Sequence, residues 1–363
     1  MKNISYYIAI IVFLLFSCSE TKQGDLLEIP VDIHKNDLLS LQEITEEIIA
    51  IELELTDESV FSPNYIQNIT LSESEVFIAG MQKIYVFSKD GQFIRTIGST
   101  GQGPGEYHRI SKIALDEKNR RLFISSSKKI VSYDINGNFL KETKVLSGEI
   151  KDINYINEEL LLLVENVYDD NKEVYYSRPT LYRLNDELRT VDSCTIMNYR
   201  YASSQLWFHK DFILKEGKSV FLYYGDFAMQ FGNDLVEKVF SDTLYRIENK
   251  YIVPELKLKF NSNGVSNFIH LFNIYRSSRY VFVIYKNANS PGTTAYYFCY
   301  DTKTGKGYNM QDGFTDDING IDKRVSIRPF NHDTEMFYYL HTHIKSGDLE
   351  EPNPTLYIGK LKK

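Results

Sequence analysis

A repeat of about 46 residues restricts this 363-residue chain to a small set of folds. The segment Glu75–Ala79 reads EVFIA, and Arg121–Ser125 reads RLFIS, 46 positions later. The same offset relates three further pairs of positions: Phe87 to Tyr133, Gly91 to Gly137, and Phe93 to Phe139. Each copy alternates short β-branched and aromatic runs with turn residues, which predicts four strands. Four strands in a unit of this length are typical of one blade of a β-propeller.

Weaker copies of the same hairpin follow, beginning near Leu181, Thr243, Tyr296 and Thr355. We therefore predict an all-β fold, a six-bladed β-propeller of four-stranded antiparallel blades, with seven blades as the main alternative. The last copy lacks a full partner strand, so we expect an N-terminal strand to close the ring and remove the exposed edge. Residues 26–31 and 48–55 could each supply that strand, and residues 37–47 could form a short helix. The propeller is expected to be a single domain over residues 26–363.

The first 17 residues are predicted to be a signal peptide. Lys2 precedes an apolar run, Ile8–Phe16, that is too short to span a bilayer, because a spanning helix needs about 20 residues. The stretch from Leu15 to Cys18 resembles the lipobox of bacterial lipoproteins, although Phe16 replaces a small residue. The resemblance implies an outer-membrane lipoprotein held in the lipid through Cys18, with residues 18–25 as a lipidated tether. A plain secretory signal is the alternative, and the periplasmic and cell-surface sides both stay open.

The net charge of the chain argues against nucleic acid as a partner. The chain carries 41 basic and 49 acidic side chains, a formal net charge of −8, so we expect no nucleic-acid partner.

Three cysteines are present. Two of them, Cys194 and Cys299, fall in the predicted third and fifth blades, which are not neighbours. We therefore expect two free and mostly buried thiols.

Three stretches carry a family resemblance. The segment 93–107 reads FIRTIGSTGQGPGEY, residues 240–247 read FSDTLYRI, and residues 316–320 read DDING. Together they resemble the six-bladed β-propeller lipoproteins of Bacteroidetes, which are loosely related to NHL-repeat propellers. The resemblance covers essentially the whole mature chain. It implies a fold and an envelope location but little about activity, since a fold alone does not identify a function.

Two predicted loops supply candidate binding residues. The glycine-rich loop at 101–107 could form an anion-binding nest with Glu106, Tyr107 and Arg109, or it could be a rigid connector between blades. Asp316 and Asp317 belong to an acidic loop whose oxygen atoms would suit Ca²⁺, although a solvated loop is the alternative. Both loops join an outer strand to the next inner strand, so we expect them on one face of the ring.

His341 and His343 point to the same side of a predicted strand, because side chains alternate with a period of two. They could bind a metal with His332 as a third ligand, or they could be an ordinary pair on the blade surface. The sequence contains no HExxH, CxxC or GxSxG motif. We predict no catalytic residues and no cofactor apart from the Ca²⁺ already mentioned.

These observations favour a lipid-anchored envelope protein that acts without catalysis. We expect it to bind a small molecule, a glycan or a protein through the loop face around the central channel. One alternative is a lyase or hydrolase with its active site in that channel. Another is a structural subunit of an envelope complex.

Overall fold

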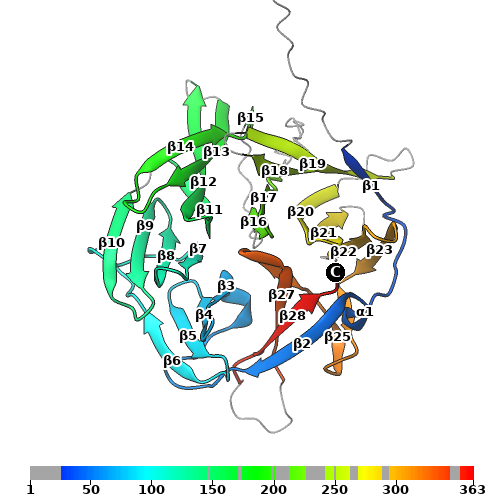
Figure 1. Cartoon of the computed structure of the whole chain (residues 1–363), viewed down its shortest axis with the longest axis horizontal. Coiled ribbons are helices and arrows are strands. Elements are labelled where there is room, and N and C mark those ends of the chain that lie inside the picture. Colours follow the sequence, from blue (N-terminus) through cyan, green and yellow to red (C-terminus); the bar gives the residue numbers. More distant parts are fainter. Residues whose placement is uncertain are drawn as a thin grey trace, which may run out of the picture.

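Six four-stranded antiparallel sheets stand in a ring around a central axis (Figure 1). The computed structural model describes residues 26–144, 147–170, 174–197, 199–200, 212–225, 242–248, 251–261, 269–287, 294–343 and 352–363. The predicted signal peptide, Cys18 and the tether lie outside these residues. The prediction of a six-bladed, all-β propeller is confirmed, and the seven-bladed alternative is wrong.

The first three blades follow the chain from the inner to the outer strand. Blade 1 contains β3 (Asn68–Leu71), β4 (Glu75–Ala79), β5 (Ile84–Ser88) and β6 (Phe93–Ile97). Blade 2 contains β7 (Lys112–Asp116), β8 (Arg121–Ser126), β9 (Lys129–Asp134) and β10 (Phe139–Lys144). Blade 3 contains β11 (Glu149–Ile156), β12 (Glu159–Asp170), β13 (Val174–Leu184) and β14 (Thr190–Thr195), and β15 (Tyr199–Arg200) pairs with β13.

Blades 4 to 6 complete the ring, and strands from the N-terminal segment join blades 4 and 6. Blade 4 contains β16 (Ile213–Glu216), β17 (Ser219–Leu222), β18 (Thr243–Glu248) and β19 (Tyr251–Phe260). Blade 5 contains β20 (Ile269–Arg276), β21 (Tyr280–Asn287), β22 (Tyr296–Asp301) and β23 (Lys306–Gln311). Blade 6 contains β26 (Arg328–Phe330), β27 (Asp333–His341) and β28 (Thr355–Leu361), after a separate hairpin of β24 (Phe314–Asp316) and β25 (Ile321–Val325).

The sequence repeat corresponds to equivalent strands, because EVFIA forms β4 and RLFIS begins β8. Side chains alternate between the two faces of each blade, so the apolar residues pack between neighbours. Phe77 and Val86 of blade 1, for example, share a buried cluster with Leu122 and Val131 of blade 2. Burial of such apolar area, at about 25 cal/mol per Å², stabilises each junction between blades.

The ring is closed by β2 (Thr45–Glu52), which pairs antiparallel with the C-terminal strand β28 from Thr45↔Leu361 to Glu52↔Thr355. This confirms the predicted closure and assigns it to the second of the two candidate segments. The first candidate does not close the ring. It forms β1 (Leu27–Val31), a parallel fifth strand on the outer edge of β19 in blade 4.

Between these strands the N-terminal segment covers the outer edge of blade 5. The backbone N–H of Asp37 donates to the carbonyl of Asn309 in β23 at 2.7 Å, and the Asp37 carboxylate accepts from the Asn309 N–H at 2.9 Å. A short helix, α1 (Leu41–Ile44), follows with a capping box formed by Ser40 and Glu43, as predicted for this region. Residues 27–52 therefore run along three consecutive blades, and we call them the N-terminal belt.

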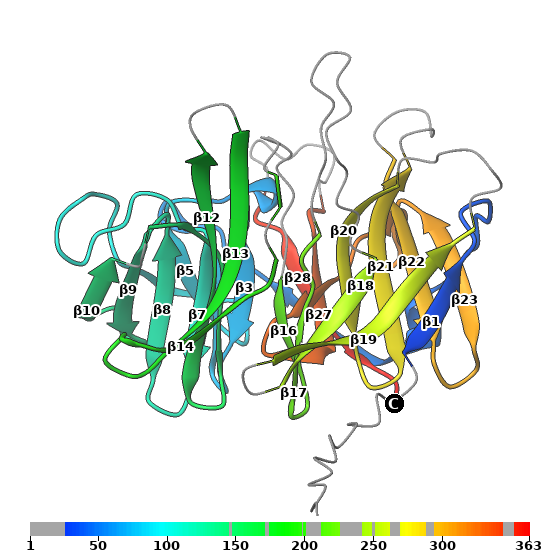
Figure 2. The same ribbon diagram turned by 90° about the horizontal axis from the view of Figure 1, so that it is seen from above.

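The two faces of the ring differ (Figure 2). One face carries the connections from each outer strand to the next inner strand and from each second strand to the third; we call it the loop face. The opposite face carries short turns such as β16–β17 and β22–β23, together with the C-terminus; we call it the turn face. Ion pairs reinforce the turns: Arg121 of blade 2 pairs with Asp116 of the same blade at 2.5 Å and with Asp186 of blade 3 at 2.6 Å, and the second pair links the two blades.

Two smaller expectations can be compared with the structure. Cys194 and Cys299 are both free, as predicted, with Cys299 buried and Cys194 only partly so. In the described part of the chain, no helix combines the length and apolar character needed to cross a membrane.

Candidate functional site

A broad groove lies at the loop-face end of blade 6, with a volume of about 970 Å³. It forms where the end of β2, the turn between β24 and β25, and the end of β27 come together. The residues lining it include Glu52, Leu55, Asp322, Lys323, His341, His343, Asn353 and Thr355. Its volume is in the range of sites that bind small molecules in proteins.

A line of aromatic rings leads from the core of blade 6 into this groove. Tyr339 and Tyr357 stack with ring centroids 4.7 Å apart. The Tyr357 hydroxyl lies 2.8 Å from Nε2 of His343, and the His343 ring meets the His341 ring edge-on at 4.5 Å. The imidazoles are therefore held in position by packing and by a hydrogen bond, as recognition of a ligand requires.

The predicted acidic loop supports the same line of rings. The Asp316 carboxylate is 2% exposed and accepts hydrogen bonds from the Tyr339 hydroxyl at 2.5 Å and from the Asn319 N–H at 2.9 Å. Burial and the adjacent Asp316 carboxylate both raise the pKa of Tyr339, so this hydroxyl stays protonated. Asp316 thus fixes the groove wall from behind, whereas Asp317 is exposed at the surface.

Burial and neighbouring charged groups set the protonation state of His341. Partial burial, His343 and Lys323 all lower the pKa of His341, so its imidazole is neutral at pH 7. Asn353, which also lines the groove, is held in place because its side-chain amide donates to the carbonyls of Glu54 at 2.8 Å and Ser59 at 3.0 Å. The groove therefore presents neutral imidazole, carboxylate and ammonium groups on a fixed frame.

The structure brings together two groups of residues that were predicted separately, because the acidic loop and the histidine pair both border this groove. His332 is not near them. It precedes β27 at the turn face, and His341 ends that strand about 30 Å away at 3.3 Å per residue, so His332 cannot be a third ligand beside His341 and His343. Among the described residues, no group of three or more His, Cys, Asp or Glu side chains could hold a metal ion.

Sequence reasoning missed Tyr339, Tyr357 and Asn353 as parts of this site. Tyr339 lies two residues before His341 on β27, so the period of two already placed it on the same side of the strand. Nothing local indicated Tyr357 or Asn353, since strand pairing and a long-range contact bring them to the groove.

The glycine-rich loop lies at the junction of blades 1 and 2 and has internal partners. Glu106 accepts from the N–H of Gly103 at 2.8 Å, and Glu142 of the next strand pair accepts from the N–H of Gly105 at 2.8 Å. Tyr107 is 1% exposed and donates its hydroxyl hydrogen to the Ile97 carbonyl at 2.6 Å. The loop thus has the geometry of a rigid connector.

The side chain of Arg109 is partly exposed near this loop, and its backbone N–H donates to the Ser126 hydroxyl at 3.2 Å. None of these contacts needs a bound anion. The ligand-binding role of Glu106, Tyr107 and Arg109 stays a prediction.

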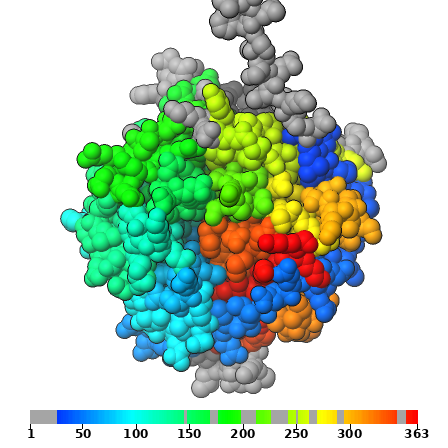
Figure 3. Space-filling view, in the orientation of Figure 1, coloured from blue at the N-terminus to red at the C-terminus, as the bar shows by residue number. Residues whose placement is uncertain are grey.

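The central channel is crossed by hydrogen bonds between blades 3, 4 and 6. Asn154 of β11 donates to the carbonyls of Ile213 at 3.2 Å and Asn331 at 2.8 Å. The Asn331 carbonyl also accepts from the N–H of Lys215 at 2.9 Å. The space-filling view of the turn face accordingly shows no opening at the axis (Figure 3). These contacts close the channel at the turn face, whereas the groove in blade 6 lies off the axis at the loop face.

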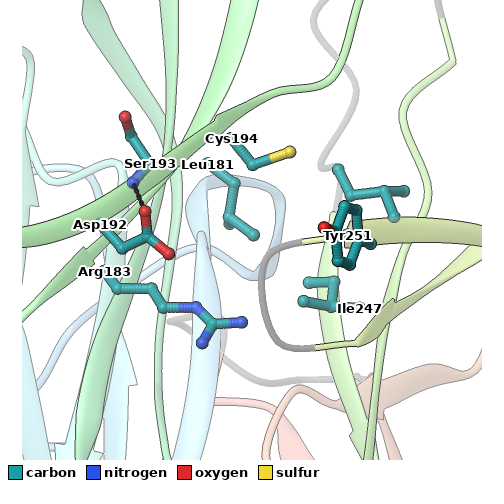
Figure 4. A pocket seen from close by; sticks show the side chains of 8 residues that line it. Leu181, Arg183, Asp192, Ser193, Cys194, Ile247 and Tyr251 are labelled. Atoms are coloured by element: carbon teal, nitrogen blue, oxygen red, sulfur yellow. Dashed lines mark hydrogen bonds between the residues drawn. The ribbon is translucent and has the colours of Figure 1, made fainter.

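A crevice between blades 3 and 4 is too small to compete with the groove. Figure 4 shows Leu181, Arg183 and Cys194 on one side of it and Ile247 and Tyr251 on the other. Its volume of about 10 Å³ is close to the space of one water molecule, so we interpret it as a packing gap.

Comparison with known proteins identifies a family and solved structures of similar fold. A family model described as "Domain of unknown function (DUF4934)" matches residues 26–361. A solved structure of a Bacteroides fragilis "Putative exported protein" aligns with a TM-score of 0.65 and 19% identity, covering 93% of this chain and all of that one. The WD40 domain of Neurospora crassa Pan2 aligns with a TM-score of 0.42 and 9% identity over 82% of this chain and 76% of that one. The comparison with curated proteins found no match.

Proposed function

This chain belongs to the DUF4934 family, and on that premise we propose that it is a lipid-anchored envelope protein that binds a polar ligand in the blade 6 groove. The observation that carries the proposal is the groove itself. Its size suits a small molecule, and its imidazoles are fixed by Tyr357 and by the buried Asp316 behind Tyr339.

The envelope location is supported by the signal-like N-terminus and by the lipobox-like stretch that ends at Cys18. The exported relative of Bacteroides fragilis agrees with this placement, which resembles that of the Bacteroidetes propeller lipoproteins. The anchor is acylated Cys18 in the outer membrane.

The ligand class follows from the chemistry of the groove walls. His341, Asp322, Glu52 and Lys323 offer both donors and acceptors of hydrogen bonds, and the imidazole faces can stack on flat or apolar ring surfaces. A saccharide satisfies both requirements. A short polar peptide or a polar metabolite is the second ligand class to test.

Binding assays on matched variants test this proposal. We would screen oligosaccharides, peptides and metabolites by thermal shift and measure the affinity of each hit by calorimetry. We expect His343→Ala and Asp322→Ala each to weaken binding about tenfold or more, because the first removes the imidazole held by Tyr357 and the second removes an exposed carboxylate that lines the groove. Glu106→Gln, on the same face but outside the groove, should leave the affinity unchanged.

The opposite pattern would contradict the groove as the site. If Glu106→Gln abolishes binding while both groove variants bind normally, the glycine-rich loop is the ligand site. If ligands are turned over and not merely bound, the lyase or hydrolase alternative replaces this proposal.

A further inference from the structure

The walls of the blade 6 groove carry more negative than positive charge. Glu52, at the end of β2, and Asp322, on β25, place exposed carboxylates on two of these walls. Of the described residues that line the groove, only Lys323 is cationic. Neither carboxylate forms an ion pair with another residue of the described ranges. Lys323 offsets one of the two charges at most, so one carboxylate stays in excess inside the groove.

The two chain segments that form these walls have the same sign of charge. Residues 52–59 continue from β2, and the side-chain amide of Asn353 ties them to the groove through the carbonyls of Glu54 and Ser59. Residues 316–324 form the opposite segment, which contains the β24–β25 turn. The carboxylates of the two segments are Glu52, Glu54, Asp57, Glu58, Asp316, Asp317 and Asp322, and their cations are Lys323 and Arg324.

The cationic side chains near the groove do not neutralise this rim. Arg324 does not line the groove and forms no ion pair within the described part of the chain. Arg328, at the start of β26, donates to the Gln67 carbonyl at 2.7 Å on the side of blade 1. Lys323 acts on His341, whose pKa is lowered by burial, by His343 and by this ammonium group. An excess of carboxylates along a groove gives it a negative potential, which attracts cations.

The arrangement of the carboxylates indicates the kind of cation. They are spread over two walls, and among the described residues no three His, Cys, Asp or Glu side chains could hold a metal ion. The groove has a volume of about 970 Å³, and Leu53, Leu55 and Ile321 add apolar surface beside the carboxylates. Such walls suit an organic cation that carries its charge on a larger body.

We propose that the blade 6 groove prefers a saccharide with a protonated amine, an amino sugar, whose ammonium group binds the carboxylates of Glu52 and Asp322. This inference rests on the proposed function, because it names the ligand class of the same groove. An ammonium group has three N–H donors and can serve both carboxylates. The hydroxyl groups of the sugar can accept hydrogen bonds from Lys323 and bond to the imidazoles of His341 and His343.

Calorimetry with three matched oligosaccharides tests the sign of the charge. Oligomers of glucosamine, N-acetylglucosamine and galacturonic acid present positive, neutral and negative groups on similar rings. For the mature chain with Cys18→Ala, at neutral pH and low salt, we expect the affinity to fall in that order. The glucosamine oligomer should bind at least about tenfold more tightly than its N-acetylated counterpart. High salt should reduce this difference, because exposed charges are screened.

Neutral variants of the same shape assign the preference to the groove. Glu52→Gln and Asp322→Asn should each reduce the preference for glucosamine over N-acetylglucosamine by at least about threefold, and together they should abolish it. Lys323→Gln should increase the preference. Asp90→Asn is the matched control, because it removes an exposed carboxylate from the β5–β6 turn on the turn face. It should leave all three affinities unchanged.

The outcomes separate this inference from the proposed function. If the three oligomers bind equally, or the galacturonic acid oligomer binds most tightly, the charge preference is wrong. A loss of that binding in His343→Ala would still identify the groove as the site. If Asp90→Asn weakens binding as much as Glu52→Gln, the preference reflects the net charge of the chain, and the inference is wrong.

Spermidine, which carries amines without a sugar, tests the saccharide part of the inference. We expect it to bind more weakly than the glucosamine oligomer, because it lacks the hydroxyl groups. Tighter binding of spermidine that Glu52→Gln weakens would replace the amino sugar with a polyamine. If none of these probes binds, the inference is overturned, and the proposed function then depends on the wider ligand screen described above.

Discussion

At the residue scale, the Asp301–Arg279 ion pair on the turn face makes the stability of the fold depend on pH. The guanidinium contacts both carboxylate oxygens, at 2.7 and 3.0 Å, and the Asp301 side chain is 10% exposed. The hydrogen bond from Arg279 outweighs burial and lowers the pKa of Asp301 to about 2. Because this value lies below that of the unfolded chain, the pair stabilises the fold above about pH 4, and the contribution is lost as pH falls toward 2.

We therefore expect Asp301→Asn to lower the free energy of unfolding by about 2 kcal/mol at pH 7. The difference from the wild type should shrink between pH 4 and pH 2, as the wild-type carboxylate becomes protonated. Urea unfolding at several pH values measures this. Asp317→Asn, at an exposed position, should change the unfolding free energy by less than about 0.5 kcal/mol throughout. A gap for Asp301→Asn that stays constant with pH would contradict the assignment.

At the element scale, the N-terminal belt contains two strands with different tasks. β2 supplies the outer strand of blade 6, and without it β28 would be an open edge that carries Leu356 and Ile358. β1 only adds to a blade that already has four strands, although it buries Ile29 and Val31 completely. The loss of each strand should therefore have a distinct effect.

A chain that begins at Asp32 should remain a folded monomer with a lower melting temperature. The loss of two buried aliphatic side chains costs about 3 kcal/mol or more. A chain that begins at Leu53 should aggregate, because an unpaired apolar edge strand pairs with other chains. Size-exclusion chromatography and thermal unfolding distinguish the two. Soluble monomers with unchanged melting temperatures for both truncations would disprove the role of the belt in closing the ring.

At the scale of the whole molecule, the order of the blades keeps the two described cysteines apart. Cys194 lies on β14 of blade 3, and Cys299 lies on β22 of blade 5, with blade 4 between them. Cys299 is 1% exposed, and burial raises the pKa of its thiol, so it is unreactive in the folded state.

Thiol titration tests this arrangement directly. With Cys18 changed to Ala, we expect one thiol to react in the native protein and two after denaturation. Both counts should be the same with and without a prior reducing step. A pair of thiols that appears only after reduction would reveal a disulfide, which the blade order does not allow.

The pattern of residues by itself determined the blades and the hairpins, because alternating side chains and short turns such as Asp90-Gly91 and Asn136-Gly137 act over a few residues. It also placed Asp316, His341 and His343 on chain segments that proved to border one groove. Only the tertiary structure decided that Asp316 turns inward to Tyr339 while Asp317 faces solvent, and that β1 joins β19 while β2 closes the ring. The physical reason is distance along the chain. A strand chooses its partner by the edge that the assembled ring leaves open, and Leu27 meets an edge at Leu256 that exists only once blade 4 has formed.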